Sequence, residues 1–341
     1  MRSITGVSMM SSALVVLLIS AFHVNGAVLS DLKAVAAFRD GINGGGITTA
    51  WTGDEFCIWP GIVCDPNTLR VTDIVLRADD PASSSLENQK FDLLSGDRTR
   101  LFSDSLCLLD QLTTLIVTDY TSISGQIPAC ITSITGLRIL DLSGNRITGE
   151  IPADIGNLSE LIVLNLADNQ ISGSIPPSIV NLRSLRILDI SNNQISGEVP
   201  SDIGNLEMLS RAILGGNQLT GSIPSSISSL SRIADLDLST NQISGSIPES
   251  IGSMPVLSAL NLYCNQLSGE IPASLFSNRG LSHLNLSRNS LEGKLPDSFS
   301  SESYFTVLDL SYNKLIGEVP KSMENVKYMG ALDLSNNNFE A

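Results

Sequence analysis

The sequence predicts an elongated α/β solenoid with a parallel sheet on its concave side. Three residue types recur with a spacing of 24 residues: proline from Pro128 to Pro320, glycine from Gly125 to Gly317, and asparagine from Asn145 to Asn337. Each ladder has nine members. A unit of this length cannot bury its apolar face alone, whereas stacked units bury each other's. The length alone would suggest roughly two domains. The period indicates one elongated solenoid instead.

One unit, LRILDLSGNRITGEIPADIGNLSE, shows why each position recurs. Leu140 and Leu142 alternate with Ile139, Asp141 and Ser143, which is typical of a short strand with one face inward. Asn145 ends this strand, and its amide can hydrogen-bond backbone groups of neighbouring turns. Gly149 permits a backbone conformation that a Cβ would obstruct. Pro152 fixes φ and gives up a donor that the edge does not need.

The first 26 residues are expected to be a secretory signal peptide. Arg2 precedes an apolar stretch from Ala13 to Phe22, and small residues follow, so cleavage is expected near Gly26 or Ala27. This stretch is too short for a bilayer, which needs about 20 apolar residues in a helix. The mature protein is therefore expected outside the cytosol, without membrane insertion after signal cleavage.

Five cysteines in such a chain permit two disulfides and leave one over. Cys57 and Cys64 enclose a short loop, and Cys107 and Cys130 enclose a longer one. Cys264 is expected to be a partly buried free thiol, with intermolecular pairing or a redox role as the alternative.

Two segments interrupt the period. Residues 78–100 are rich in Asp, Ser and Pro, which indicates a loop that leaves the stack. The turn LTTLIVTDYTSISG carries one residue more than the others and has Thr121 where Asn stands elsewhere, so it is expected to be distorted.

The pattern LxxLxLxxNxITGxIPxxIGxL resembles the plant extracellular leucine-rich repeat, of which the Gly-x-Ile-Pro part is distinctive. Upstream, SDLKAVAAFRDGI, Trp51 and CIWPGIVCDP resemble the N-terminal cap of that family. RVTDIVLR, Cys107, Cys130 and NLYCNQL are similar to the small secreted DNA-damage repair/toleration-like group, which is related to polygalacturonase-inhibiting proteins. The resemblance implies a right-handed leucine-rich-repeat superhelix and a recognition function.

This resemblance divides the chain into a signal peptide (1–26), an N-terminal cap with an irregular loop (27–100), and about ten repeats (101–341). The cap departs from the family at Phe56, where a Cys-Cys pair is usual, and the upstream Cys is missing too. One family bridge is therefore absent, while the bridge from Cys57 to Cys64 remains.

The C-terminal end departs further from the family. Family members continue into a cysteine-containing cap, whereas this sequence stops at Ala341 in a truncated last repeat. The expectation is either a truncated gene product or an edge that a partner covers. Leu332, Leu334 and Phe339 are expected to be exposed there.

Composition excludes several classes of function. With 35 acidic and 20 basic residues the net charge is −15, which opposes binding to nucleic acid or to an anionic membrane. The only histidines are His23, in the signal, and His283, so a Ser-His-Asp site is improbable. Phosphate loops, paired His motifs and Cys-x-x-Cys sites are absent from the sequence. We expect no enzyme, no cofactor and no metal.

The outward positions of the strands indicate where a partner binds. One column carries mostly acids and amides: Asp141, Asn165, Asp189, Ile213, Asp237, Asn261, Asn285, Asp309 and Asp333. It is either a solvated structural column or a surface for a basic or hydroxyl-rich partner. Ca²⁺ needs six to eight oxygen ligands, and lone carboxylates on separate strands do not supply them.

A recognition surface is predicted where this column is interrupted and where aromatic and basic residues share its face. Tyr and Arg are enriched among interface hot spots. The alternative is that these residues are scattered over the surface without a common role. The candidate partner-binding residues are Arg211, Ile213, Asp237, Tyr263, His283, Arg288 and Tyr312.

Two sequons mark possible N-glycans. Asn157 is expected on the convex wall, where a glycan hinders nothing. Asn285 is expected on the concave sheet, where an attached glycan would count against binding.

The leading hypothesis is a secreted, non-enzymatic recognition protein of the plant cell wall space that binds a protein or peptide, with a wall-degrading enzyme as one candidate target in plant defence. The alternative is the ectodomain fragment of a receptor-like protein or receptor kinase. Binding to pectin is disfavoured because polygalacturonate and a chain of charge −15 repel each other.

Overall fold

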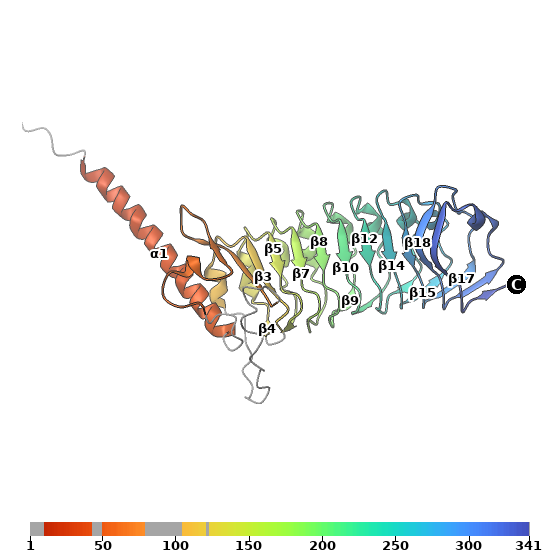
Figure 1. Cartoon of the computed structure of the whole chain (residues 1–341), viewed down its shortest axis with the longest axis horizontal. Coiled ribbons are helices and arrows are strands. Elements are labelled where there is room, and N and C mark those ends of the chain that lie inside the picture. Colours follow the sequence, from red (N-terminus) through yellow and green to blue (C-terminus); the bar gives the residue numbers. More distant parts are fainter. Residues whose placement is uncertain (1–9, 43–49, 79–103, 121–122, 341) are drawn as a thin grey trace, which may run out of the picture.

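The structure, a computed structural model, describes residues 10–42, 50–78, 104–120 and 123–340. These residues form a long stack of turns, with helix α1 (Met10–Ile42) at its N-terminal end (Figure 1). Twelve strands of the described chain join in one sheet whose spatial order follows the sequence. The fold is therefore the α/β solenoid that the 24-residue period predicts.

The concave sheet is parallel except at its first pair, where β1 and β2 run antiparallel. Neighbouring turns pair in register: Arg211 lies opposite Asp235, and Ile213 opposite Asp237. The strands are β1 (Ile62–Cys64), β2 (Val71–Arg77), β3 (Thr114–Thr118), β5 (Ile139–Asp141), β7 (Val163–Asn165), β8 (Ile187–Asp189), β10 (Arg211–Ile213), β12 (Asp235–Asp237), β14 (Ala259–Asn261), β16 (His283–Asn285), β18 (Tyr304–Asp309) and β20 (Tyr328–Asp333).

A second set of short parallel strands follows the concave strands along the flank. They form three smaller sheets. Their members are β4 (Ser124–Gln126) with β6 (Arg146–Thr148); β9 (Ser196–Glu198) with β11 (Gln218–Thr220); and β13 (Ser244–Gly245), β15 (Gln266–Gly269), β17 (Ser290–Lys294), β19 (Lys314–Gly317) and β21 (Asn338–Phe339).

Most regular turns return along the convex side through a short helical segment, whereas the turn after Pro296 has none. The ladder prolines sit just before several of these segments; Pro224, with φ −67°, precedes η8. The helical segments are η1 (Phe56–Ile58), η3 (Asp104–Leu108), η4 (Ala129–Ser133), η5 (Ile155–Asn157), η6 (Pro177–Asn181), η7 (Ile203–Asn205), η8 (Ser225–Ser229), η9 (Glu249–Ser253), α2 (Ser274–Ser277) and η10 (Lys321–Asn325).

The asparagine ladder has the predicted role. The Asn217 Nδ2 donates to the carbonyl oxygens of Ile190, Leu214 and Gly215 at 2.9, 3.1 and 3.4 Å. Its Oδ1 accepts from the Ile195 N–H at 3.0 Å. Each such side chain satisfies backbone groups that the bend would otherwise leave buried without partners.

The glycine ladder is also explained by the backbone. Gly149 has φ +79°, and a Cβ there would lie 2.7 Å from the Cγ of Gln126 in the preceding turn. The absent side chain thus makes room for the neighbouring one.

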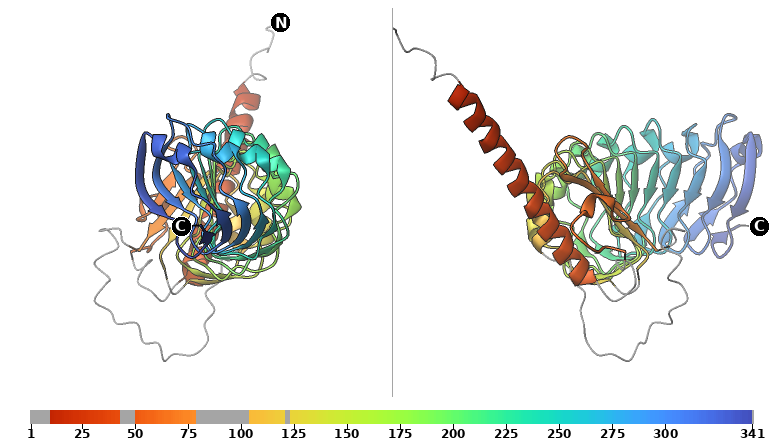
Figure 2. Two further views of the ribbon diagram at one scale, coloured as in Figure 1. Left: turned by 90° about the vertical axis from the view of Figure 1, so that its right-hand side faces the viewer. Right: turned by 60° about the vertical axis from the view of Figure 1, so that its left-hand side comes forward.

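A continuous apolar core runs from Ala34 in α1 to Leu315 in β19. The C-terminal part of α1 lies across the first turns (Figure 2), and Trp51 stacks on Trp59 beneath it at 5.3 Å between ring centroids. Residues 10–26 of the expected signal peptide form the first part of α1.

An ion pair ties the cap to the sheet. Asp31 on α1 is fully buried, and its carboxylate accepts from Arg70 Nε and Nη2, both at 2.9 Å. The backbone N–H of Val71 donates to the same carboxylate at 2.9 Å. Asp110 binds Arg70 from outside.

The interrupted parts of the period lie mostly outside the described residues, since these leave out 79–103 and 121–122. Asp119 has φ +67° and Gly144 has φ +69° at the equivalent position 25 residues later. The extra residue that the sequence indicates therefore lies between them.

The last described turn exposes part of the core, as expected. Leu332 is 42% exposed. The expectation is only partly met by Leu334 and Phe339, which are half-buried because they pack against the preceding turn.

Candidate binding surface

The concave sheet presents its outward residues in straight columns. Within β10, Ala212 points into the core while Arg211 and Ile213 on either side face outward. The parallel register repeats this arrangement in every strand from β5 to β18. The face is therefore a lattice in which a residue's neighbours lie 24 positions away in sequence.

Arg211 lies beside an acidic group that includes Asp235, Asp237 and Asp189. Its Nε lies 3.3 Å from the Asp235 Oδ2, and both side chains are substantially exposed. Partial burial raises the pKa of Asp235, as do the charges of Asp237 and Asp189, while Arg211 and His283 lower it. The carboxylates in this part of the sheet thus outnumber the cations.

Asp235 was not among the predicted site residues. It stands 24 positions after Arg211, so the register alone would have placed the two side by side. The 24-residue spacing was therefore sufficient to predict this neighbour. The prediction considered the column that contains Asp237, which is a different outward position of the same strand.

Asp237 is held in place by its surroundings. Its Oδ1 accepts from the Ser239 N–H at 2.8 Å, and its Oδ2 accepts from the Asn261 Nδ2 at 2.9 Å. Gly215 in the preceding turn allows this approach, since a Cβ there would lie 3.0 Å from the Asp237 Oδ1. Half-buried Ile213 lies in register between Asp237 and Asp189.

A second column lies just past the strand ends, where one residue per turn adopts the left-handed backbone conformation. For a residue other than glycine this conformation costs about 1 kcal/mol or more. Most turns place Gly, Asn or Asp there, which tolerate it best. The column is Asp119, Gly144, Asp168, Asn192, Gly216, Thr240, Cys264, Arg288, Tyr312 and Asn336.

Arg288 and Tyr312 are the two largest side chains in this left-handed column, with φ +54° and +53°. The Arg288 guanidinium carbon lies 4.4 Å from the centroid of the Tyr312 ring. This cation–π contact orients two exposed side chains from consecutive turns. Tyr312 remains 46% exposed.

The predicted residues form two groups rather than one patch. Arg211, Ile213 and Asp237 lie on the neighbouring strands β10 and β12. His283 lies on β16, and Arg288 follows that strand. Two strand steps of about 4.8 Å separate β12 from β16. Tyr263 follows β14, between the groups, and is half-buried.

Both expected disulfides are present, with S–S distances of 2.04 Å between Cys57 and Cys64 and 2.09 Å between Cys107 and Cys130. Cys264 is a free, half-buried thiol in the left-handed column.

The two sequons differ in accessibility. Asn157 is exposed at the end of η5. Asn285 is half-buried in β16, and its Oδ1 accepts from both the N–H and the Oγ of Ser287, at 3.0 and 2.7 Å. Ser287 is itself buried.

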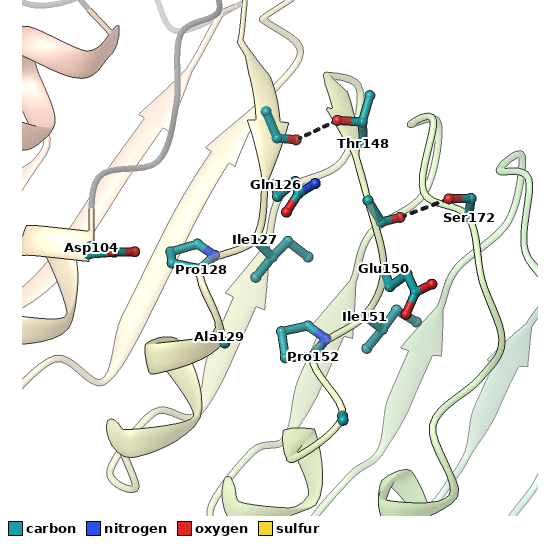
Figure 3. A pocket seen from close by; sticks show the side chains of 13 residues that line it. Asp104, Gln126, Ile127, Pro128, Ala129, Thr148, Glu150, Ile151, Pro152 and Ser172 are labelled. Atoms are coloured by element: carbon teal, nitrogen blue, oxygen red, sulfur yellow. Dashed lines mark hydrogen bonds between the residues drawn. The ribbon is translucent and has the colours of Figure 1, made fainter.

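A hollow lies on the flank, away from these residues. It has a volume of about 890 Å³, and the rings of Pro128 and Pro152 line it together with Gln126 and Glu150 (Figure 3). A second hollow of about 880 Å³, between residues 246 and 316, uses the same repeat positions. Both are open grooves that the repeat itself generates, and the predicted binding residues line neither.

The described residues provide neither a metal site nor a membrane span. No cluster of three or more His, Cys, Asp or Glu side chains among them could hold a metal ion. Nor does any helix within these residues have the length and apolar character to cross a membrane.

Comparison with known proteins defines the class. Family models match residues 103–214 as a leucine-rich repeat region, and residues 232–254 and 255–315 as leucine-rich repeats. Together they cover more than half of the chain. The chain therefore belongs to the leucine-rich-repeat proteins, a fold that typically has no enzymatic activity.

Among curated proteins, the chain is similar to DNA damage-repair/toleration protein DRT100 of Arabidopsis thaliana, with 49% identity over 121 residues. The match covers 34% of this chain and 32% of that protein. The chain thus spans about a third of the length of this relative.

Solved structures of plant receptor ectodomains share the fold. One is the ectodomain of the Arabidopsis thaliana receptor kinase GASSHO1/SCHENGEN3 in complex with CASPARIAN STRIP INTEGRITY FACTOR 2, with 29% identity and a TM-score of 0.79 over 90% of this chain and 36% of that one. Another is the Arabidopsis receptor kinase HAESA in complex with the peptide hormone IDA and the co-receptor SERK1, with 28% identity and a TM-score of 0.67 over 91% of this chain and 54% of that one.

Proposed function

We propose that this chain is a secreted, non-enzymatic recognition protein that binds a protein or peptide through its concave sheet. The observation that carries the proposal is the outward face of β10 to β18 and the turns after these strands, which carries Arg211, Ile213, Asp237, Tyr263, His283, Arg288 and Tyr312. Similar ectodomains have been solved in complex with peptide hormones, which supports the same mode here.

Location outside the cytosol agrees with the cysteine chemistry. Two disulfides among five cysteines are expected in an oxidising compartment. The proposed signal peptide at residues 1–26 would deliver the chain there, to the extracellular space or cell wall.

The test is capture of partners from plant extracellular fluid by the secreted chain, followed by quantitative mass spectrometry. The parent is compared with a Tyr263→Ala, Tyr312→Ala double variant and with Arg183→Ala. Arg183 is exposed after η6 on the convex side and serves as the matched control. We expect the double variant alone to lose partners. Equal recovery by all three proteins would contradict binding at this face.

Glycan mapping provides an independent check. We propose that Asn157 carries a glycan and that Asn285 does not, because the Asn285 side chain is engaged in the sheet. Mass spectrometry of the secreted chain that finds Asn285 fully glycosylated would place a bulky group on the proposed binding face and contradict the proposal.

Within this function, inhibition of a microbial wall-degrading enzyme is the specific role that we propose first. Addition of the secreted chain to polygalacturonases should then lower their activity, and the tyrosine double variant should not.

A receptor-like ectodomain is the second candidate, favoured by the structural match to GASSHO1/SCHENGEN3. The genomic sequence beyond the codon for Ala341 separates the two, since a transmembrane segment there supports the receptor and a cysteine cap followed by a stop codon supports the secreted protein.

A further inference from the structure

The guanidinium of Arg288 has no charged partner among the described residues, whereas two other arginines of the C-terminal half have one. Arg211 pairs with Asp235, and Arg279 pairs with Glu302. Among the described residues, no ion pair or hydrogen bond joins the Arg288 side chain to another group, and its one contact of this kind is with the Tyr312 ring. In a chain with 35 acids and 20 bases, this leaves strong donors unused.

The backbone under this pair is fixed. The Arg288 N–H donates to the Ser311 carbonyl at 3.0 Å, and the Tyr312 N–H donates to the Ser335 carbonyl at 3.0 Å. Both residues hold a left-handed conformation that neither side chain favours. Because the ring covers one face of the guanidinium, the N–H groups at its edge remain available in a defined plane.

The nearest acid of the outward column does not compete for these donors. Asp309 Oδ1 accepts from the Ser311 N–H at 3.0 Å and from its Oγ at 2.7 Å. The acidic group at Asp235 and Asp237 lies two strand steps away, about 10 Å, which exceeds the screening length of about 8 Å at physiological salt. A negative charge bound at Arg288 is therefore largely shielded from those carboxylates.

We infer that Arg288, held by Tyr312, binds the side-chain carboxylate of an Asp or Glu in the partner. A planar guanidinium matches a carboxylate through two parallel hydrogen bonds. A polyanion is disfavoured because acids flank the site on both sides. The turns before and after Arg288 continue the lattice, so a bound segment passes over this residue, which favours a side-chain carboxylate over a terminal one.

This inference rests on the proposed function and sharpens it. The remainder of the segment lies over β10 and β12, where Asp235 and Asp237 favour basic or hydroxyl-bearing residues. The partner is thus a segment with one acid, separated from its basic residues by the width of two strands. At about 3.3 Å per residue, an extended segment spans that distance with three or four residues.

The test uses a displayed library of random twelve-residue peptides fused at their C-termini, so that no terminal carboxylate is available. Selection on the full chain should yield peptides with one fixed Asp or Glu. Changing this acid to its amide should weaken binding about tenfold, which is the size expected for a lost charge-assisted pair. With the Arg288→Gln variant, changing the peptide's acid to its amide should weaken binding no further. Both substitutions remove the same interaction, so their effects do not add.

Matched variants separate a specific role from a structural one. Arg288→Glu should select peptides with Lys or Arg at that position. Tyr312→Phe keeps the ring and should keep the preference, whereas Tyr312→Leu should reduce it several-fold. Arg183→Gln, on the convex side, should change nothing.

Two failures are distinguishable. Peptides that bind an Ile213→Lys, Tyr263→Ala double variant as tightly as the parent do not use the concave face, and they overturn the proposed function together with this inference. Peptides that bind the parent but not this double variant use the concave face. If none of their acids contributes less to binding when Arg288 is changed to Gln, the Arg288 assignment alone is overturned.

Discussion

The two ends of the described solenoid differ in how far they bury the apolar surface of the terminal turn. At the N-terminal end, the non-repeating residues Phe38, Trp51 and Trp59 cover the first turns and are themselves buried. At the C-terminal end, the last described turn consists of the same repeat as its neighbours. Leu308 is fully buried, whereas Leu332 in the same repeat position is 42% exposed.

This difference shows that the burial of a side chain in a solenoid depends on the neighbouring turns that pack against it. The sequence of its own turn does not determine it. Leu308 and Leu332 occur in the nearly identical strings VLDLSYN and ALDLSNN. Only the first has a described turn on each side. Identical repeat positions should therefore contribute unequally to stability.

The largest effect is expected at the buried ion pair of the cap. Asp31→Ala leaves Arg70, whose side chain is only 13% exposed, without its main partner. Breaking a buried pair from one side costs about 3–5 kcal/mol. Urea unfolding should report a loss of this size. Asp110→Ala, which removes the exposed partner of the same arginine, is the control and should cost far less.

Next in size is the comparison of Leu308→Ala with Leu332→Ala. The first leaves a cavity in the core and should lower the free energy of unfolding by about 3 kcal/mol. The second removes a side chain that already contacts water and should cost less than about 1 kcal/mol. Equal losses would mean that the last described turn is covered in solution.

Substitutions in the asparagine ladder should also cost more stability inside the solenoid than at its C-terminal end, by a smaller margin than the leucine substitutions. Asn217→Leu leaves buried carbonyl groups without donors, at a cost of about 1–3 kcal/mol. Asn337→Leu removes equivalent bonds to Leu310 and Leu334. Asn337 is half-buried, so water replaces part of the loss and thermal unfolding should show a smaller shift.

The smallest effect concerns pH. The backbone N–H of Thr68 lowers the pKa of Asp65 most, followed by the N–H of Asn67 and the hydroxyl of Thr68. A lowered folded-state pKa stabilises the fold above the unfolded-state pKa of about 3.9, and this gain disappears as pH falls through the folded-state value. Asp65→Ala should therefore lower the melting temperature slightly at pH 7, and by less as the pH falls below the unfolded-state pKa of Asp65.

Asp333 provides the matching measurement at the other end, because hydrogen bonds from Ser335 lower its pKa as well. Asp333→Ala should shift the curve with the same sign. A dependence on pH at one end only would show that the two turns do not unfold together.

Much of the fold was predictable because the same structural positions recur in nine repeats. The inward leucines, the asparagine bonds and the room above Gly149 all follow from one unit. The pairing of Asp31 with Arg70 could not be predicted in this way, since the two residues lie 39 positions apart in a segment without a repeat.

The candidate site was predictable in outline only. Sequence position placed Arg288 and Tyr312 in one column, but the contact between them depends on two rotamers and a left-handed backbone. Asp235 was missed although the register implied it. The spacing of 24 gives neighbours, whereas the side-chain conformations decide which neighbours touch.

The asparagine bonds have a direction that matters during synthesis. Asn217 reaches back to Ile190 and Ile195 of the preceding turn, and Asn337 reaches back to Leu310 and Leu315 in the same way. Every turn that leaves the ribosome thus completes the polar groups of the turn already made. The chain can therefore assemble in order from its first turn onward, while each turn keeps some backbone groups unpaired until the next turn has been translated.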